Sequence, residues 1–273
     1  MLGRSVFFYL KSKYPNYIWG THREKIRKGD LLKLNAQTLE ADFKSIFKKL
    51  KRIDYVINCI GIVKENQVLN TLIETNGLFP HKLERLAEQY NFKLIHVSTD
   101  AVFSETAGAM NEKNLPAPTD NYGLSKLAGE TTSENAITFR TSVLGLDPID
   151  HKGLLEWILG NKKTIKGYVN QIWSGCTVLQ FAKLCEEIIS KKKFGYLRKK
   201  SPFFHFAPLG PITKYQIIKV FLEELGRKKI LKRAYGTKMT RTLKTLYFDY
   251  LSYNSYTNKI SLALKEVIDF EKT

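Results

Sequence analysis

A tyrosine and a lysine stand four residues apart in the segment 121–126, where they could support proton transfer to a carbonyl group. Asp120 or Asn121 can cap a helix that begins just before Tyr122 and includes Lys126. Side chains four residues apart on a helix share one face, with about 5–6 Å between Cβ atoms. An ammonium at that distance favours the phenolate, so we expect the pKa of Tyr122 to be lowered toward neutrality. Tyr122 could then protonate a carbonyl oxygen.

A hydroxyl group is expected beside this pair, because Thr99 ends an apolar segment. Residues 93–97 have the pattern of a buried parallel strand. Ligands of doubly wound sheets bind outside the carboxyl ends of the strands. Thr99 is therefore expected to face a substrate. A tyrosine and a lysine at this spacing also occur on ordinary exposed helices, so the added hydroxyl is what favours chemistry.

Together, these three side chains resemble the catalytic trio of the extended short-chain dehydrogenase/reductases. Neighbouring segments narrow the resemblance to dTDP-4-dehydrorhamnose reductase and related nucleotide-sugar reductases. The segments are VINCIG at 56–61, ETN at 74–76, STDAVF at 98–103, YGLSKLAGE at 122–130 and FRTS at 139–142.

The resemblance implies catalytic roles for Thr99, Tyr122 and Lys126. The expected reaction is hydride transfer from NADPH to the keto carbon of a 4-keto-6-deoxy nucleotide sugar, in deoxysugar and surface polysaccharide biosynthesis. Tyr122 would protonate the developing alkoxide, and Thr99 would donate a hydrogen bond to the same oxygen. Lys126 would tune the phenol and hold the nicotinamide ribose.

The resemblance also implies a set of cofactor-binding residues. Besides Tyr122 and Lys126, these are Gly3, Asn58, Cys59, Gly61 and Asn76. Gly61 would allow close approach of the cofactor to the backbone. Asn76 would prop the active-site region, although a lone asparagine there could equally cap or kink a helix.

Three residues are expected near the adenosine end of the cofactor. Arg23 follows an expected short strand at 17–20, and an arginine there can grip a 2′-phosphate. NADPH is thus favoured, while NADH stays possible and an ordinary surface arginine would look the same. Asp30 and Leu31 match the segment that contacts adenine in the family, although a turn aspartate before a helix would be indistinguishable.

Substrate contacts are expected from two segments. The first is Thr99 with the four residues after it, Asp100, Ala101, Val102 and Phe103. The second is the loop at 170–177, where Trp173 could stack on a base or a sugar. A core position for this tryptophan is an equal alternative.

Alternating strands and helices predict an α/β fold with a parallel sheet. By resemblance, residues 1–145 form a Rossmann-like doubly wound domain, and residues 146–273 mainly a small substrate-binding lobe with some elements returning to the sheet. Strands are expected at 54–60, 136–140, 164–169 and 203–206. Helices are expected at 69–90 with an interruption near Gly77 and Pro80, at 154–159, at 178–190 capped by Thr177, and at 212–225.

The first residues, 1–5, resemble the end of the family's glycine-rich turn, followed by an amphipathic helix. The strand and the earlier glycines that should precede Gly3 are not in the sequence. We therefore expect an open slot in the middle of the sheet and weak dinucleotide binding. Either about a dozen residues are encoded upstream, or the protein is a remnant.

The net charge is +18, from 44 Lys and Arg against 26 Asp and Glu. Basic clusters at 48–52, 191–193 and 227–229 are expected at the ends of helices, where cations complement the helix dipole. They lack interleaved aromatic residues and any known reader motif, so we expect no nucleic-acid or membrane partner. A positive field would suit a diphosphate substrate.

Three cysteines without C-x-x-C spacing, at 59, 176 and 185, suggest neither a disulfide framework nor a metal site. A reducing cytoplasm fits best. No apolar run approaches the length of a membrane span. A homodimer is possible.

Other functions remain open at this point. Dehydratases of the superfamily usually carry Thr-Asp-Glu, and Ala101 stands where the glutamate would be. Reductases often carry a tyrosine there, so Ala101 also leaves the sugar open. The alternatives are another sugar-nucleotide epimerase or reductase, and a non-catalytic protein similar to the regulatory subunit of methionine adenosyltransferase.

Overall fold

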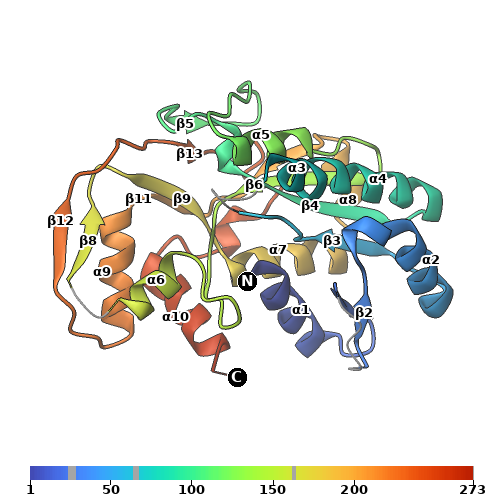
Figure 1. Cartoon of the computed structure of the whole chain (residues 1–273), viewed down its shortest axis with the longest axis horizontal. Coiled ribbons are helices and arrows are strands. Elements are labelled where there is room, and N and C mark those ends of the chain that lie inside the picture. The colour runs from blue at the N-terminus through green and yellow to red at the C-terminus, as the bar shows by residue number, and fades with distance from the viewer. Residues whose placement is uncertain (24–28, 64–67, 162–163, 273) are drawn as a thin grey trace.

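The computed structural model describes residues 1–23, 29–63, 68–161 and 164–272. A parallel sheet flanked by helices occupies one side of the molecule, and a smaller group of helices and short strands occupies the other (Figure 1). The expected Rossmann-like α/β fold is confirmed. The division at residue 145 remains a prediction.

The main sheet has the strand order β10-β6-β4-β3, and every neighbouring pair is parallel. Its strands are β3 (Tyr55–Asn58), β4 (Lys93–Thr99), β6 (Ala136–Thr141) and β10 (Phe203–His205). All four match predicted strands. In the register of β4 and β6, Thr99 lies beside Thr141, so both threonines reach the carboxyl edge of the sheet.

A second parallel sheet contains β1 (Gly20–His22) and β2 (Leu31–Lys33). Within the described residues, no backbone ladder joins β1 to β3. The sheet is therefore interrupted, as expected from the sequence. The strand predicted at 17–20 was placed too early, because Tyr17 lies in a turn and pairing with β2 begins at Gly20.

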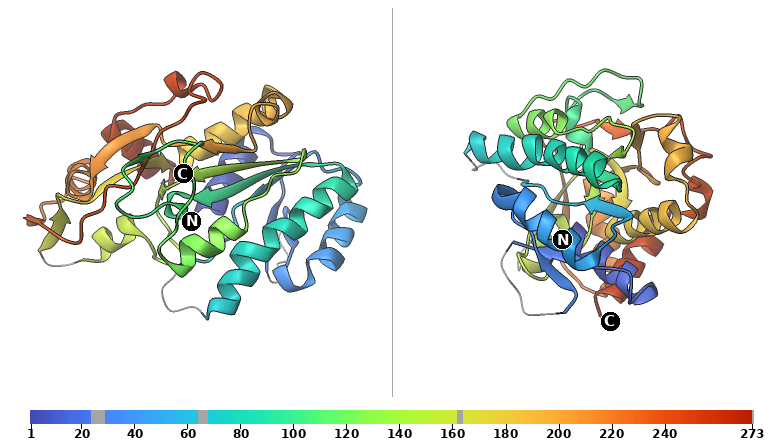
Figure 2. Two further views of the ribbon diagram at one scale, coloured as in Figure 1. Left: turned by 90° about the horizontal axis from the view of Figure 1, so that it is seen from above. Right: turned by 90° about the vertical axis from the view of Figure 1, so that its right-hand side faces the viewer.

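Helices cover both faces of the main sheet (Figure 2). On one face α1 (Leu2–Lys13), α7 (Val178–Ser190) and α8 (Phe194–Arg198) pack on Ile95 and Ile137. On the other, α2 (Leu39–Leu50) and α4 (Phe79–Tyr90) pack on Leu94 and Ala136. Successive residues of β4 thus point to opposite faces, and both are buried.

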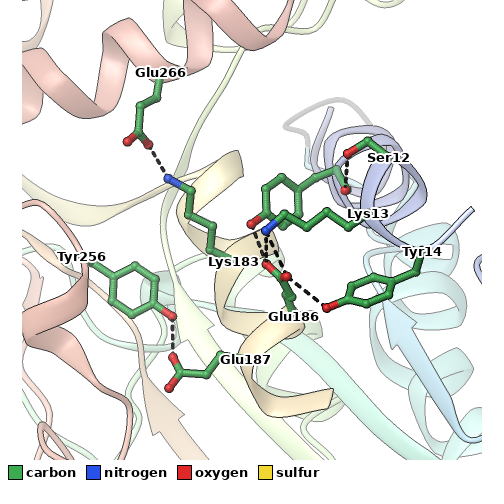
Figure 3. Close-up of polar contacts among 9 residues, drawn as sticks. Ser12, Lys13, Tyr14, Lys183, Glu186, Glu187, Tyr256 and Glu266 are labelled. Carbon is green, nitrogen blue, oxygen red and sulfur yellow. Dashed lines mark hydrogen bonds and ion pairs between the residues drawn. The ribbon is translucent and has the colours of Figure 1, made fainter. Parts of the chain in front are cut away.

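Polar contacts on α7 hold α1 in place (Figure 3). The Glu186 carboxylate accepts hydrogen bonds from the hydroxyls of Tyr9 at 2.6 Å and Tyr14 at 3.1 Å. It also pairs with Lys13 at 3.0 Å. These contacts hold the C-terminal half of α1 against α7.

The smaller part of the molecule has its own core. It contains α6 (Leu154–Gly160), β8 (Ile165–Tyr168), α9 (Lys214–Glu224), β12 (Leu231–Ala234) and α10 (Ile260–Phe270), which bury Leu155, Ile165, Phe221 and Leu264 among others. Between the two parts lie β7 (Val143–Leu144), β9 (Ile172–Thr177) and β11 (Leu209–Thr213) in one sheet, and β5 (Ala109–Met110) paired with β13 (Thr242–Leu243).

Local sequence signals at the ends of several helices are confirmed. Thr177 caps α7 in a capping box with Gln180. Lys48 and Lys49 lie in the last turn of α2, the cluster at 191–193 directly follows α7, and the cluster at 227–229 follows the end of α9 at Glu224 after two intervening residues. In the part of the chain that the structure describes, no helix is long and apolar enough to cross a membrane.

Candidate active site

The tyrosine and the lysine lie on α5 (Asn121–Ala128), as predicted. The Asp120 carboxylate caps this helix by accepting a hydrogen bond from the Gly123 amide at 2.6 Å. Tyr122 is half-buried, whereas Ser125 and Lys126 are buried on the side that faces the sheet.

Two glycines let α5 lie very close to its neighbours. A Cβ atom on Gly123 would stand 2.2 Å from the carbonyl oxygen of Ala101, and one on Gly129 would stand 1.9 Å from that of Asn76. Neither distance is tolerable for a carbon atom. The glycine after Tyr122 therefore allows the helix to rest on the turn that follows β4, next to Thr99.

The electrostatics of Tyr122 differ from the sequence-based expectation. Burial raises the pKa of Tyr122 to about 12, and hydrogen bonding with Thr99 offsets this only in part. Lys126 does not oppose the rise, because its ammonium donates to the backbone carbonyl of Val97 at 2.6 Å. The expected lowering of the tyrosine pKa is therefore wrong for the chain without cofactor.

Lys126 is itself an unusual group, since its side chain is only 4% exposed. Burial lowers the pKa of Lys126 to about 8, and the charge of Glu130 opposes this. A Cβ atom on Gly61 would stand 3.9 Å from the Lys126 ammonium and 3.4 Å from Oδ1 of Asn76. The bare backbone at Gly61 thus leaves a narrow space beside the lysine.

Asn76 connects the loop after β3 to α5. Its Oδ1 accepts from the Ile62 amide at 2.8 Å, while its Nδ2 donates to the Ile62 carbonyl at 2.9 Å and to Oγ of Ser125 at 3.1 Å. It lies in a π-helical stretch, Ile73–Leu78, between α3 (Leu69–Leu72) and α4, where the long helix was expected to be interrupted. Asn76 thus joins the loop after β3 to α5, and its role in supporting an active site remains a prediction.

Other candidate cofactor residues lie at the end of β3. A Cβ atom on Gly3, in the first turn of α1, would stand 3.3 Å from Cβ of Cys59. Asn58 is buried, and its Oδ1 accepts from the Ile60 amide at 3.1 Å. Burial raises the pKa of Cys59 to about 12, so this thiol is no nucleophile at neutral pH.

These positions fit a dinucleotide in two respects. Gly3 and Gly61 carry no side chain where a ligand would approach the backbone, and both adjoin the end of β3. The first turn of α1 brings free amide groups to the same place. Gly3, Cys59, Gly61, Asn76 and Lys126 thus form one connected group, and their contact with a cofactor remains a prediction.

The three residues expected near the adenosine do not lie together. Arg23 is exposed and follows the carboxyl end of β1. Asp30 and Leu31 lie at the amino end of β2, where Asp30 pairs with Lys11 at 3.0 Å. Ligands of parallel sheets bind at the carboxyl ends of strands, whereas Asp30 and Leu31 lie at the opposite end of β2, and their contact with adenine remains a prediction. Asn35 and Ala36, which follow β2, occupy the matching end.

The residues after Thr99 divide into polar and buried positions. Asp100 accepts hydrogen bonds from Thr99 and Arg241. Ala101 is buried, and the Val102 and Phe103 side chains are 0% and 1% exposed. These two pack against Leu243 and its neighbours, so direct side-chain contacts from Val102 and Phe103 to a substrate were wrongly predicted. Val102 and Phe103 anchor the turn at 100–102 to this hydrophobic cluster.

Trp173 lies on β9 beside the carboxyl end of β6. Its indole nitrogen donates to Oγ of Ser142 at 2.7 Å, and the ring is half-buried. Trp173 is therefore neither fully buried in the core nor fully exposed. Its exposed part is available to a ligand at this edge, and a substrate contact remains a prediction.

Two charged contacts near the site were not predicted. Arg140 on β6 pairs with Glu130 at 2.6 Å, both almost fully buried, and Ser98 donates to the same carboxylate at 2.8 Å. The sequence signal that could have predicted this pair is the presence of opposite charges, Glu130 and Arg140, in two segments that are otherwise buried. The contact of Arg241 with Asp100 had no such signal in the sequence, because Arg241 lies in a Lys-rich stretch far along the chain. Within the described ranges, no group of residues could hold a metal ion.

Comparison with known proteins places these residues in a family context. A family model described as RmlD substrate binding domain matches residues 38–245. The probable low-salt glycan biosynthesis reductase Agl14 of Haloferax volcanii is 34% identical over 119 residues, which are 39% of this chain and 39% of that protein. The match thus spans well under half of this curated relative.

Solved structures share the fold at low sequence identity. A dTDP-4-dehydrorhamnose reductase from Clostridium acetobutylicum is 19% identical, with a TM-score of 0.75 over 100% of this chain and 96% of its own. One from Bacillus anthracis in complex with NADP is 17% identical, with a TM-score of 0.68 over 88% and 90%. A dTDP-glucose 4,6-dehydratase from B. anthracis in complex with NAD is 16% identical, with a TM-score of 0.75 over 100% and 93%. The shared fold alone does not separate these reactions.

Proposed function

Because the chain belongs to the family described as the RmlD substrate binding domain, we propose that it reduces a 4-keto-6-deoxy nucleotide sugar with NADPH. The observation that carries the proposal is that α5, which bears Tyr122 and the buried Lys126, rests on the turn that directly follows Thr99. The product would serve deoxysugar and surface polysaccharide biosynthesis.

The residues of the chain can complete the reduction as follows. NADPH, when bound, supplies a hydride that forms a new C–H bond at the keto carbon. The electron pair of the carbonyl π bond moves to oxygen, which takes the proton of Tyr122. Burial keeps that phenol protonated at neutral pH, as a proton donor requires. The product is a secondary alcohol.

Two further side chains act on the same centre. Thr99 ends β4 directly before the turn on which α5 rests, and its hydroxyl would donate a hydrogen bond to the substrate oxygen. Lys126 lies beside the space at Gly61, where it would bind the nicotinamide ribose. In the reaction the Lys126 ammonium, which donates to the Val97 carbonyl at 2.6 Å, would hold the ribose and favour proton release by Tyr122.

Tyr122→Phe tests the proposal. Removal of the hydroxyl leaves the ring in place, so NADPH consumption with a dTDP-4-keto-6-deoxy sugar should fall about 10²–10⁴-fold. Cofactor affinity should stay within about threefold of the parent. Tyr17→Phe is the matched control, because Tyr17 is an exposed tyrosine in the turn before β1.

The outcomes separate the alternatives. Loss of turnover in Tyr122→Phe alone supports the reductase. Equal turnover in parent and variant refutes the role of Tyr122. A parent that binds the nucleotide sugar and reduces nothing favours an epimerase or a regulatory protein, which isomer analysis and partner capture would then distinguish.

Cofactor choice is tested at Arg23. Only NADPH carries a 2′-phosphate for a charge-assisted hydrogen bond, worth about 1.5–3 kcal/mol. Arg23→Ala should therefore weaken NADPH binding about 10–150-fold and NADH binding far less. Arg85→Ala, on the exposed side of α4, is the control. Equal losses for the two cofactors would show that Arg23 does not read the phosphate.

A further inference from the structure

A single arginine from the C-terminal half of the chain holds the turn that carries Thr99. Arg241 lies just before β13, and its Nε donates to Oδ2 of Asp100 at 3.3 Å. Its Nη1 donates to the carbonyl oxygen of Phe103 at 3.0 Å. The guanidinium therefore spans both ends of the short 3₁₀ turn at 100–102.

The second oxygen of Asp100 continues this connection to the catalytic residues. Its Oδ1 accepts a hydrogen bond from the Thr99 hydroxyl at 3.1 Å. The Thr99 oxygen in turn accepts from the Ala101 amide at 3.2 Å. The turn directly after Thr99 is also the one on which α5, the helix of Tyr122, rests. A chain of polar contacts thus runs from Arg241 through Asp100 to Thr99, beside the helix that carries Tyr122.

The setting favours a fixed arrangement. The side chains of Arg241 and Asp100 are 10% and 14% exposed, so their pairing is shielded from water. The backbone around Arg241 is fixed as well, because the amides of Thr240 and Arg241 both donate to the Glu105 carbonyl, at 2.8 and 3.0 Å. A planar guanidinium with two donors in use holds a turn more rigidly than a single ammonium can.

We propose that Arg241 is a positioning residue of the active site. By holding both Asp100 and the Phe103 carbonyl, it fixes the turn after β4 and so the position of the Thr99 side chain relative to Tyr122. It contacts neither cofactor nor reacting atoms in this role. The inference rests on the proposed reduction for its catalytic consequence, and on the geometry alone for its effect on the turn.

Geometry of this kind has a measurable effect on rate. A misplacement of about 1 Å at a reacting group can lower turnover about 10²-fold. Arg241→Gln should therefore lower kcat at least tenfold. The Kd for NADPH should stay within about twofold of the parent, because the side-chain hydrogen bonds of Arg241 go to Asp100 and Phe103 and to no candidate cofactor residue in the described ranges. Arg241→Lys should restore part of kcat, since lysine can pair with Asp100 but cannot also reach Phe103 in the same fork.

Hydrogen exchange tests the turn without any substrate. The Phe103 amide donates to the Asp100 carbonyl at 3.0 Å, and the Ala101 amide donates to Thr99. Exchange of these two amides should accelerate at least tenfold in Arg241→Gln. Arg233→Gln is the matched control, because Arg233 on β12 is exposed and its guanidinium lies over the ring of Tyr215, away from the turn at 100–102.

The two readouts keep the proposals distinct. Faster exchange at 101–103 with a fall in kcat supports the positioning role. Unchanged exchange, or a kcat within threefold of the parent in Arg241→Gln, overturns it. If the parent reduces no nucleotide sugar, the proposed function fails, and the exchange measurement still decides whether Arg241 fixes the turn.

Discussion

Lys126→Met should stabilise the protein while it abolishes turnover. The Lys126 ammonium is buried with no carboxylate within hydrogen-bonding distance in the described part of the chain, and burial lowers its pKa from 10.5 to about 8. A shift of this size corresponds to about 3 kcal/mol of unfavourable free energy for the charged form. The variant also loses the hydrogen bond to the Val97 carbonyl, which lowers the gain in stability by about 1 kcal/mol. We therefore expect a gain of about 2 kcal/mol in unfolding free energy at pH 7.

The pH dependence supplies the sign test for this prediction. Between the folded and unfolded pKa of Lys126, the unfolded state binds more protons, so the stability of the parent rises as pH increases through this window. The gain from Lys126→Met should therefore shrink by about 2 kcal/mol between pH 7 and pH 10.

Urea unfolding followed by circular dichroism measures both quantities. Lys219→Met is the matched control, because Lys219 lies exposed on α9 and its replacement should change stability by less than about 0.5 kcal/mol at any pH. A Lys126→Met variant that is less stable than the parent at pH 7, or whose advantage does not change with pH, refutes the reasoning.

Three other perturbations probe the framework of the site. Glu187→Gln should remove an acid-sensitive contribution to the free energy of unfolding. Burial raises the pKa of Glu187, but hydrogen bonds from Lys193 and Ser252 outweigh it and lower this pKa to about 2. With a discount for partial solvation, the parent should therefore have about 1–2 kcal/mol of stability above pH 4.5 that it loses toward pH 2, and the variant should not. Acid unfolding curves of the two proteins that coincide would contradict this. Gly123→Ala should lower both thermal stability and turnover, since its Cβ would meet the Ala101 carbonyl at 2.2 Å, whereas Gly195→Ala, with open space around it, should be neutral. Glu130→Gln should cost about 3–5 kcal/mol by leaving Arg140 buried without its carboxylate, and urea midpoints equal to those of the parent would show that the pair is not needed.

Much of the fold could be predicted because its signals are local. The caps of α5 and α7, the apolar runs of β4 and β6 and the basic helix ends each depend on residues close together in the sequence. The misplaced start of β1 and the unexpected position of Asp30 and Leu31 at the amino end of β2 have one cause. A three-residue strand has too few positions for a period to show where it begins, so the end that meets a ligand could not be assigned.

By itself, the sequence determined that Tyr122 and Lys126 share one helix, that Thr99 ends a central strand, and which family pattern they follow. Only the tertiary structure decided what each group interacts with. Lys126 turns to a carbonyl of β4, Gly123 lies against Ala101, and Arg241 reaches Asp100 across 141 positions. A helical spacing is a property of neighbouring residues, whereas burial and charge pairing depend on segments that meet only after folding. The pKa of Tyr122 is raised instead of lowered for that reason.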